Sequence, residues 1–177
     1  MSWGNRPVNW DAPGQPDLGE DRQKILDQIE FLTSPPMAEL RRTTAFSIPN
    51  SSTTAIQFDS AVIDNYSGWV AGSPSRWTVP VAGIYLVSGL LSWASNATGL
   101  RTAEIGVNGT TVPGTQTRIT PVSGSATAIP TLAKLITLAV NDYVELRSFQ
   151  SSGGALNTDA ALTDDYTSIS ICWKGSA

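Results

Sequence analysis

Hydrophobic and polar residues alternate along most of the chain from about residue 43 onward, which is the period-two pattern of half-buried β-strands. Glycine, proline, asparagine or serine residues separate these runs, as they do between short strands. Runs of this kind cover residues 55–58, 77–79, 84–93, 101–107, 132–140, 143–149 and 168–173. So many short strands in one domain predict a β-sandwich.

The strongest turn signal among these runs is Asn108-Gly109. Both central positions of a type I′ hairpin turn need a positive φ, which asparagine and glycine tolerate. The turn should join residues 101–107 to a short run near Thr111 and Val112. We expect no helix longer than one turn after Arg42, and no repeat of fixed period is visible.

The first part of the chain has a different pattern. Residues 3–19 contain three prolines and three glycines, which favour an extended arm over a regular element. Residues 17–32 then predict one helix, with Asp17 as its N-cap and Pro35-Pro36 beyond its end. Its apolar residues near one face are Leu18, Ile25, Ile29 and Leu32. Because such a short helix is marginal alone in water, this stripe should bury either on the following domain or on copies of itself.

Charge divides the chain near Arg42. Residues 1–42 hold seven acids and five bases, whereas residues 43–177 hold only eight acids and six bases in a much longer stretch. Serine and threonine replace helix-favouring charged residues after this point, which is typical of strands and turns. We therefore predict an N-terminal arm and helix over residues 1–42 and a β domain over residues 43–177.

The composition excludes most classes of enzyme and several classes of partner. The chain has 177 residues, no histidine and a single cysteine, Cys172, so nucleophile–histidine pairs, histidine-ligated zinc and intrachain disulfides are absent. Its net charge of −4 argues against nucleic-acid binding. The longest apolar run, residues 84–93, is too short and too interrupted to insert into a membrane, and the first residues predict no secretory signal.

Acidic residues are candidate catalytic groups. Asp159, Asp164 and Asp165 could supply the carboxylate pair of a glycosidase. A solvated loop explains them better, because adjacent aspartates in an extended segment point to opposite faces. Glu104 and Glu145 are expected at exposed or edge positions. We predict no catalytic residue, no metal site and no cofactor.

The six tryptophans suggest binding surfaces. Trp3 and Trp10 on the arm are expected to anchor the chain in a partner protein, since aromatic residues dominate interface hot spots. Tyr66 and Trp69 lie in a loop-like stretch and are candidate contacts for a receptor or a glycan, because sugars stack on exposed aromatic rings. Trp77 is better explained as a core residue.

Several short motifs resemble the jelly-roll domain shared by complement globular heads and tumour-necrosis-factor-like ligands. The matching residues are Phe58-Asp59, Trp77, then Pro80, Gly83 and Tyr85, then Asn108-Gly109, and finally Leu138, Asp142, Val144 and Leu146. The resemblance covers roughly residues 43–177 and implies an all-β antiparallel jelly-roll sandwich. Asn141 replaces the family's usual glycine, and residues 168–173 keep the alternation but not the motif of the family's last strand. No acid cluster matches a calcium site.

The N-terminal part resembles the leader of small fibre or decoration proteins of tailed phages that infect actinobacteria. The matching features are the arm, the helix ending in residues 28–33 and the following residues 34–41. This resemblance implies a homotrimer whose leader docks on the capsid or tail.

We therefore predict a structural phage virion protein, assembled in the host cytoplasm and displayed on the virion surface. Its predicted partner is the major capsid or tail protein, bound through Trp3, Trp10 and the Ile25, Ile29 and Leu32 stripe. A host-surface glycan is a candidate ligand of the jelly roll. The alternative is a secreted or cell-surface module for carbohydrate binding or adhesion.

Overall fold

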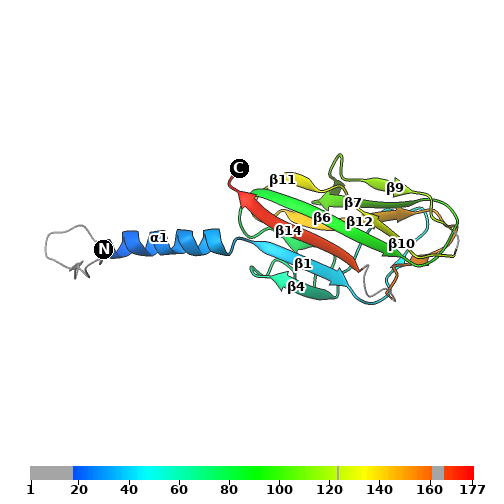
Figure 1. Cartoon of the computed structure of the whole chain (residues 1–177), viewed down its shortest axis with the longest axis horizontal. Helices are drawn as coiled ribbons and strands as arrows, with labels where there is room; N and C mark the ends of the chain where they lie inside the picture. Colours follow the sequence, from blue (N-terminus) through cyan, green and yellow to red (C-terminus); the bar gives the residue numbers. More distant parts are fainter. Residues whose placement is uncertain (1–17, 123, 161–165) are drawn as a thin grey trace, which may run out of the picture. The chain divides into compact units, whose positions relative to one another are not determined.

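The computed structural model describes residues 18–122, 124–160 and 166–177, and the chain forms two compact units that meet between Pro35 and Pro36. The first contains the helix α1 (Leu18–Thr33), and the second, which we call the head, is a β-sandwich over residues 36–177. Figure 1 shows α1 and the strands of the head. The helix agrees with the predicted span 17–32, and its predicted N-cap, Asp17, lies outside the described residues.

The end of α1 follows from its sequence. The Thr33 hydroxyl donates to the Ile29 carbonyl at 2.9 Å, and Pro35 and Pro36 lack the N–H groups that another turn would need. Along the helix, Gln23 donates to Asp27 one turn later at 2.7 Å. Side chains from residue 22 to residue 30 are all exposed in the part of the chain that the structure describes.

Two antiparallel sheets form the head (Figure 1). The first sheet has the order β10 (Thr127–Pro130), β6 (Gly83–Trp93), β14 (Thr167–Gly175), β1 (Met37–Arg42) and β4 (Ser60–Asp64), and β11 (Lys134–Leu138) also pairs with β6. The second has the order β3 (Thr54–Ala55), β12 (Tyr143–Gln150), β7 (Arg101–Val107) and β8 (Thr110–Thr111), while β5 (Trp77–Thr78) pairs with β12 and β9 (Thr117–Ile119) with β7. A small ribbon joins β2 (Ser47–Ile48) to β13 (Leu156–Asn157).

The core lies between the two sheets and is built by alternate residues of each strand. Every second residue at the start of β6, including Tyr85 and Val87, is buried. Ile105 belongs to the core in β7, where residues 101–106 are all buried. The Trp77 and Tyr85 rings meet edge to face with their centroids 5.8 Å apart, which confirms the prediction that Trp77 is a core residue. Burial raises the pKa of Tyr85 to about 12, and its hydroxyl donates to the Val81 carbonyl at 2.6 Å.

Asparagine and glycine residues with positive φ angles form two of the turns in the head. Asn108 and Gly109 have φ angles of 51° and 76°, so the hairpin between β7 and β8 has the predicted turn. Asn141, which stands where the resembling family has glycine, also has a positive φ of 70°. The jelly-roll prediction, including this position, is confirmed.

The boundary between the two units differs from the change in charge at Arg42. Strand β1 (Met37–Arg42) pairs with β14 from Met37↔Cys172 to Arg42↔Thr167, so these residues belong to the sandwich. Its charged residues Glu39 and Arg41 face outward, while Ala38 and Leu40 are buried. This strand was not predicted, because its outward-facing charged residues give it a composition like that of the helical segment before it.

Candidate interaction surfaces

The outer face of the first sheet carries an apolar row that crosses four strands. Leu135 of β11 lies opposite Leu86 of β6, which lies opposite Cys172 of β14, which in turn lies opposite Met37 of β1. Directly opposed residues in antiparallel strands point to the same face. We call these four residues the basal row, because Met37 opens the first strand of the head. Leu135 and Leu86 are 59% and 36% exposed, and Cys172 and Met37 are partly exposed.

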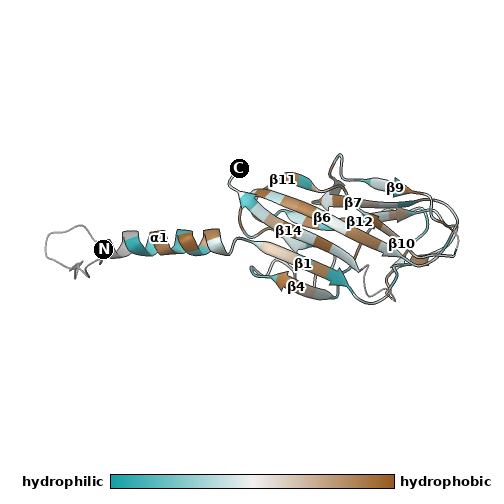
Figure 2. Cartoon of the chain, viewed as in Figure 1, coloured by the Kyte–Doolittle hydropathy of each residue, from teal (hydrophilic) through white to brown (hydrophobic). Residues whose placement is uncertain are grey.

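The row that adjoins the basal row on this face is mostly polar. Ser88 of β6 lies opposite Ser170 of β14, which lies opposite Glu39 of β1, and the row ends in the exposed Ile63 of β4. The Arg41 guanidinium bonds to Glu39 at 2.6 Å and lies 5.2 Å from the centroid of the Tyr166 ring. Hydropathy therefore changes along this face, and Figure 2 shows hydrophobic and hydrophilic bands on β6, β14 and β1. The basal row is the part suited to an apolar contact.

The helix carries the second apolar surface. Ile25, Ile29 and Leu32 are 56%, 52% and 68% exposed, and Leu26 beside them is 48% exposed. We call these four residues the helix stripe. Figure 2 shows hydrophobic and hydrophilic bands alternating along α1. The other predicted anchors, Trp3 and Trp10, lie outside the described residues.

The loop with Tyr66 and Trp69 is held in place by one carboxylate. Asp64 accepts hydrogen bonds from the Gly68 and Trp69 backbone N–H groups at 3.0 and 2.9 Å and from the Trp77 indole at 2.9 Å. The Trp69 indole is partly buried against the core and donates to the Pro74 carbonyl at 3.1 Å. Tyr66 is also partly buried. Trp69 thus covers the core edge near Trp77, and the sequence could not distinguish this role from an exposed contact.

The outer face of the second sheet holds buried carboxylates. Glu104 and Glu145, which the sequence analysis placed at exposed or edge positions, are only 4% and 8% exposed. They do point away from the core, but side chains around them exclude water: the Thr111 hydroxyl and the Gln116 amide donate to Glu104 at 2.7 and 2.6 Å. Strand β7 places Glu104 directly opposite Arg147 of β12, 3.9 Å away. That expectation was wrong because alternation reveals the face of a residue but not what covers it.

The second buried carboxyl has a perturbed pKa. Desolvation raises the pKa of the Glu145 carboxyl, and attraction to Arg147, a backbone hydrogen bond at Gly109 and attraction to Arg76 oppose that rise. The Arg147 guanidinium donates to the Gly109 carbonyl at 2.5 Å, and Arg76 lies 5.0 Å from the centroid of the Tyr143 ring. The arginines thus have other partners besides Glu145, and burial decides the direction of the shift.

A groove of about 360 Å³ opens beside Glu104. The Arg118 guanidinium donates to the Gln116 amide oxygen at 2.8 Å, and the Gln116 amide in turn donates to Glu104, so planar polar groups follow one another along the wall. The partly buried Phe149 ring adds an apolar surface. The residues that line this groove, which we call the outer groove, are Thr53, Leu100, Thr102, Glu104, Gln116, Arg118 and Phe149.

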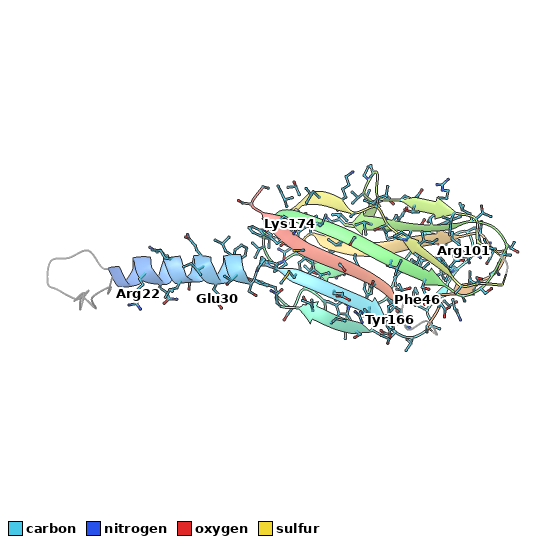
Figure 3. The ribbon with its side chains drawn as sticks, viewed as in Figure 1. Arg22, Glu30, Phe46, Arg101, Tyr166 and Lys174 are labelled. Carbon is cyan, nitrogen blue, oxygen red and sulfur yellow. The ribbon has the colours of Figure 1, made fainter. Side chains whose placement is uncertain are left out.

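The outer groove reaches toward the end of the head that lies away from the basal row. Thr102 and Leu100 adjoin Arg101, and Figure 3 shows Arg101 and Lys174 at opposite ends of the sandwich. Arg101 itself is fully buried and donates to the carbonyls of Thr98, Leu100 and Asn96. Burial lowers the pKa of Arg101, and its guanidinium lies 5.6 Å from the centroid of a Trp93 ring. This arginine ties the loop before β7 to the core.

Of the three aspartates considered for catalysis, the structure describes only Asp159. Asp159 is partly buried, and its backbone N–H donates to the Ser92 carbonyl, while Asp164 and Asp165 lie outside the described residues. Among the residues that the structure describes, no group of three acids or thiols is arranged to hold a metal ion. Within the same residues, no helix has the length and apolar character needed to cross a membrane.

Comparisons with known proteins relate the chain to others through its fold alone. No protein-family model and no curated protein matches the sequence. The globular domain of zebrafish complement 1qA protein superposes with a TM-score of 0.57 at 10% identity, covering 80% of this chain and 99% of that one. Eiger TNF from S. frugiperda gives 0.58 at 13% identity over 80% and 95%, and murine APRIL gives 0.57 at 13% identity over 77% and 98%. The head thus has the jelly-roll fold of complement 1q and tumour necrosis factor domains.

Proposed function

We propose that this chain is a structural phage virion protein, a homotrimeric fibre or decoration protein that displays its jelly-roll head on the capsid or tail. The arm, with Trp3 and Trp10, would dock on the major capsid or tail protein, and the work of the molecule would be binding rather than turnover. The observation that carries the proposal is the division of the chain: the head has a complete core, whereas the helix stripe stays exposed. A folded head behind a segment that cannot bury its own apolar side chains suits display from a larger assembly.

The basal row supports a contact between heads. It is a continuous apolar band across four strands, beside a row that contains Ser88, Ser170 and Glu39, and it includes Met37, the first residue of β1. Contiguous exposed apolar patches usually mark interaction sites. Burying the basal row between copies would also gather the preceding segments at one end, as an anchored fibre requires.

Solution mass tests the trimer. We expect the full chain and residues 36–177 both to run at three times the chain mass in light scattering coupled to size exclusion. The Leu86→Glu and Leu135→Glu double variant should shift the 36–177 form toward a monomer, since it buries two charges in the contact. The matched control is Val140→Glu, because Val140 is 52% exposed in a turn outside the basal row. A wild-type head that remains monomeric would exclude this mode of association.

Particle incorporation tests the virion role. Deletion of residues 1–35 removes the arm and α1 but leaves the head, which has its own core. The truncated protein should fold yet be absent from purified particles, because no other segment carries the anchor residues. Normal incorporation of the truncated protein would refute the anchor.

The outer groove favours a second candidate function, binding of a saccharide at the host surface. The Gln116 amide and the Arg118 guanidinium can both donate to sugar hydroxyls, and the Gln116 amide oxygen can accept from them, while Glu104 holds Gln116 in place. Phe149 offers an aromatic ring to the sugar's apolar face. Glycan-array binding by the head should be lost in Arg118→Ala and Gln116→Ala. Lys174→Ala, a change to an exposed cation at the other end of the head, serves as the control. Equal binding by all three variants would exclude the outer groove.

A further inference from the structure

Helix α1 has a heptad pattern of apolar residues, most of which stay exposed in the part of the chain that the structure describes. Leu18, Ile25 and Leu32 recur every seven residues, and Arg22 and Ile29 fall between them, so the intervals alternate between four and three. An average interval of 3.5 residues is the spacing of a coiled-coil seam, in which alternate positions are called a and d. Arg22 and Ile29 then occupy a positions, and the three residues that recur every seven occupy d positions.

Exposure supports the same seam. The d residues Ile25 and Leu32 and the a residue Ile29 are each more than half exposed, although isoleucine and leucine usually bury such surface in a folded protein. Leu26, at 48% exposure, widens the apolar stripe on one side. Between residues 22 and 33, the helix positions outside the stripe are polar or charged, including Gln23, Lys24, Asp27 and Glu30, with the partly buried Phe31 as the exception. A narrow apolar seam with a solvated back suits association along one helix face rather than burial on all sides.

The residue types indicate how many helices meet. In parallel coiled coils, isoleucine at both a and d favours three or four strands over two. The central layers of this seam are Ile25 at d and Ile29 at a. Arg22 is the one charged residue on the seam, and a single charged residue at an a position fixes the register of the strands at some cost in stability. Figure 3 labels Arg22 and Glu30 on α1.

We propose that α1 forms a parallel, in-register coiled coil with the α1 helices of two other copies of this chain, and that the helix stripe is buried between them. The proposal rests on the homotrimer proposed above. In this arrangement the helix stripe contacts the same stripe of the two other copies, and the arm makes the contact with the capsid or tail.

The head makes this short coiled coil feasible. Two heptads are too few to associate strongly on their own, because helix formation has a costly nucleus. A trimer of heads would hold three α1 segments together at an effective concentration on the order of millimolar. Only Ser34 and Pro35 separate α1 from the head, so the linker is short, and proline limits its conformations. The head therefore supplies the local concentration, and the helix adds a clasp at its base.

Cysteine cross-linking of the full-length chain tests the arrangement. In a Cys172→Ala background, which removes the native thiol and keeps the basal row apolar, Ile25→Cys and Leu32→Cys each place one thiol at a d position. The matched control is Asp27→Cys, since Asp27 lies two residues from Ile25 and on the solvated back of the helix. Under mild oxidation we expect both d-position variants to form disulfide-linked dimers about tenfold faster than the control, because identical d positions meet across a parallel seam.

The outcomes separate the two proposals. A chain that is trimeric by light scattering but shows equal cross-linking at positions 25, 27 and 32 would overturn the coiled coil and leave the trimeric head standing. Cross-linking at only one of positions 25 and 32 would overturn the parallel, in-register arrangement. A monomeric full-length chain would overturn both the trimer and the coiled coil. Trimeric mass with fast cross-linking at both d positions is the result that the proposal requires.

Discussion

The head and the helix of this protein solve the burial of apolar side chains in opposite ways. In the head, residues such as Trp77, Tyr85 and Leu146 lose all contact with water between two sheets. In α1, Ile25, Ile29 and Leu32 keep more than half of their surface. Because strand residues alternate, each sheet has one apolar face, and the other sheet covers it. A single helix has one apolar stripe and no second layer to cover it. The head therefore has a core of its own, whereas the described part of the helix leaves its apolar stripe exposed.

The largest expected effect is a loss of unfolding free energy in the head that leaves the helix unchanged. Trp77→Ala removes a fully buried side chain that packs on Tyr85, and it should cost the head about 3–5 kcal/mol of unfolding free energy. Ile25→Ala, as the matched helix change, should leave the unfolding of the head unchanged. Urea unfolding of residues 36–177 and of the full chain, followed by tryptophan fluorescence, checks both variants. A large loss of head stability in Ile25→Ala would show that the helix packs on the head instead.

The next effect concerns a close approach between two strands of the first sheet. A methyl group at Gly83 would lie 2.2 Å from the Trp173 indole nitrogen and 2.6 Å from the Gly175 carbonyl oxygen. Gly83→Ala should therefore displace the end of β14 and cost about 1–3 kcal/mol, as overpacked sites do. Gly72→Ala is the control, because a methyl group there meets no atom within 4 Å. Thermal unfolding that is equal for the two variants would contradict the close packing.

Removal of the Asp64 carboxylate, which holds the Trp69 loop, should have a similar or slightly smaller effect on stability. Asp64→Ala removes the acceptor of the Trp77 indole and of two backbone N–H groups, which should cost about 1–3 kcal/mol for the unsatisfied donors. The loop should also become susceptible to proteolysis between residues 64 and 77. Limited proteolysis of Asp64→Ala measures this susceptibility, and Asp27→Ala, a change on the exposed helix, is the control. Identical cleavage of the two variants would argue that the loop is held by other contacts.

The smallest effect is a dependence of head stability on pH. The folded pKa of Glu145 is raised, so the folded head binds a proton more readily there than the unfolded chain does. Its contribution to stability is present below the ordinary glutamate pKa and is lost as pH rises through the raised folded value. Glu145→Gln should therefore flatten the pH profile in that window and raise stability slightly at neutral pH. An unchanged profile in urea titrations from pH 4 to pH 8 would show that the arginines, rather than burial, set this pKa.

Much of the head could be predicted because its local signals agree with its tertiary structure. The alternation in residues 101–107 corresponds to β7, and Asn108-Gly109 forms the predicted turn, since both signals act over a few neighbouring residues. The candidate surfaces were harder to predict. Strand β1 was missed because its outward-facing charges resemble those of the helix, and the basal row joins residues from four strands that are far apart in the sequence.

The sequence by itself determined the helix, the alternating strands and the turn at Asn108-Gly109, because each depends on short-range backbone and side-chain preferences, and the jelly roll was expected from the family resemblance of its motifs. Only the tertiary structure decided which side chains meet. It placed Leu86 beside Leu135 and Cys172, covered Glu104 with Thr111 and Gln116, and turned Trp69 toward the core. The physical reason is that period-two alternation assigns a residue to one face of a strand, whereas strand order and register determine its neighbours on that face.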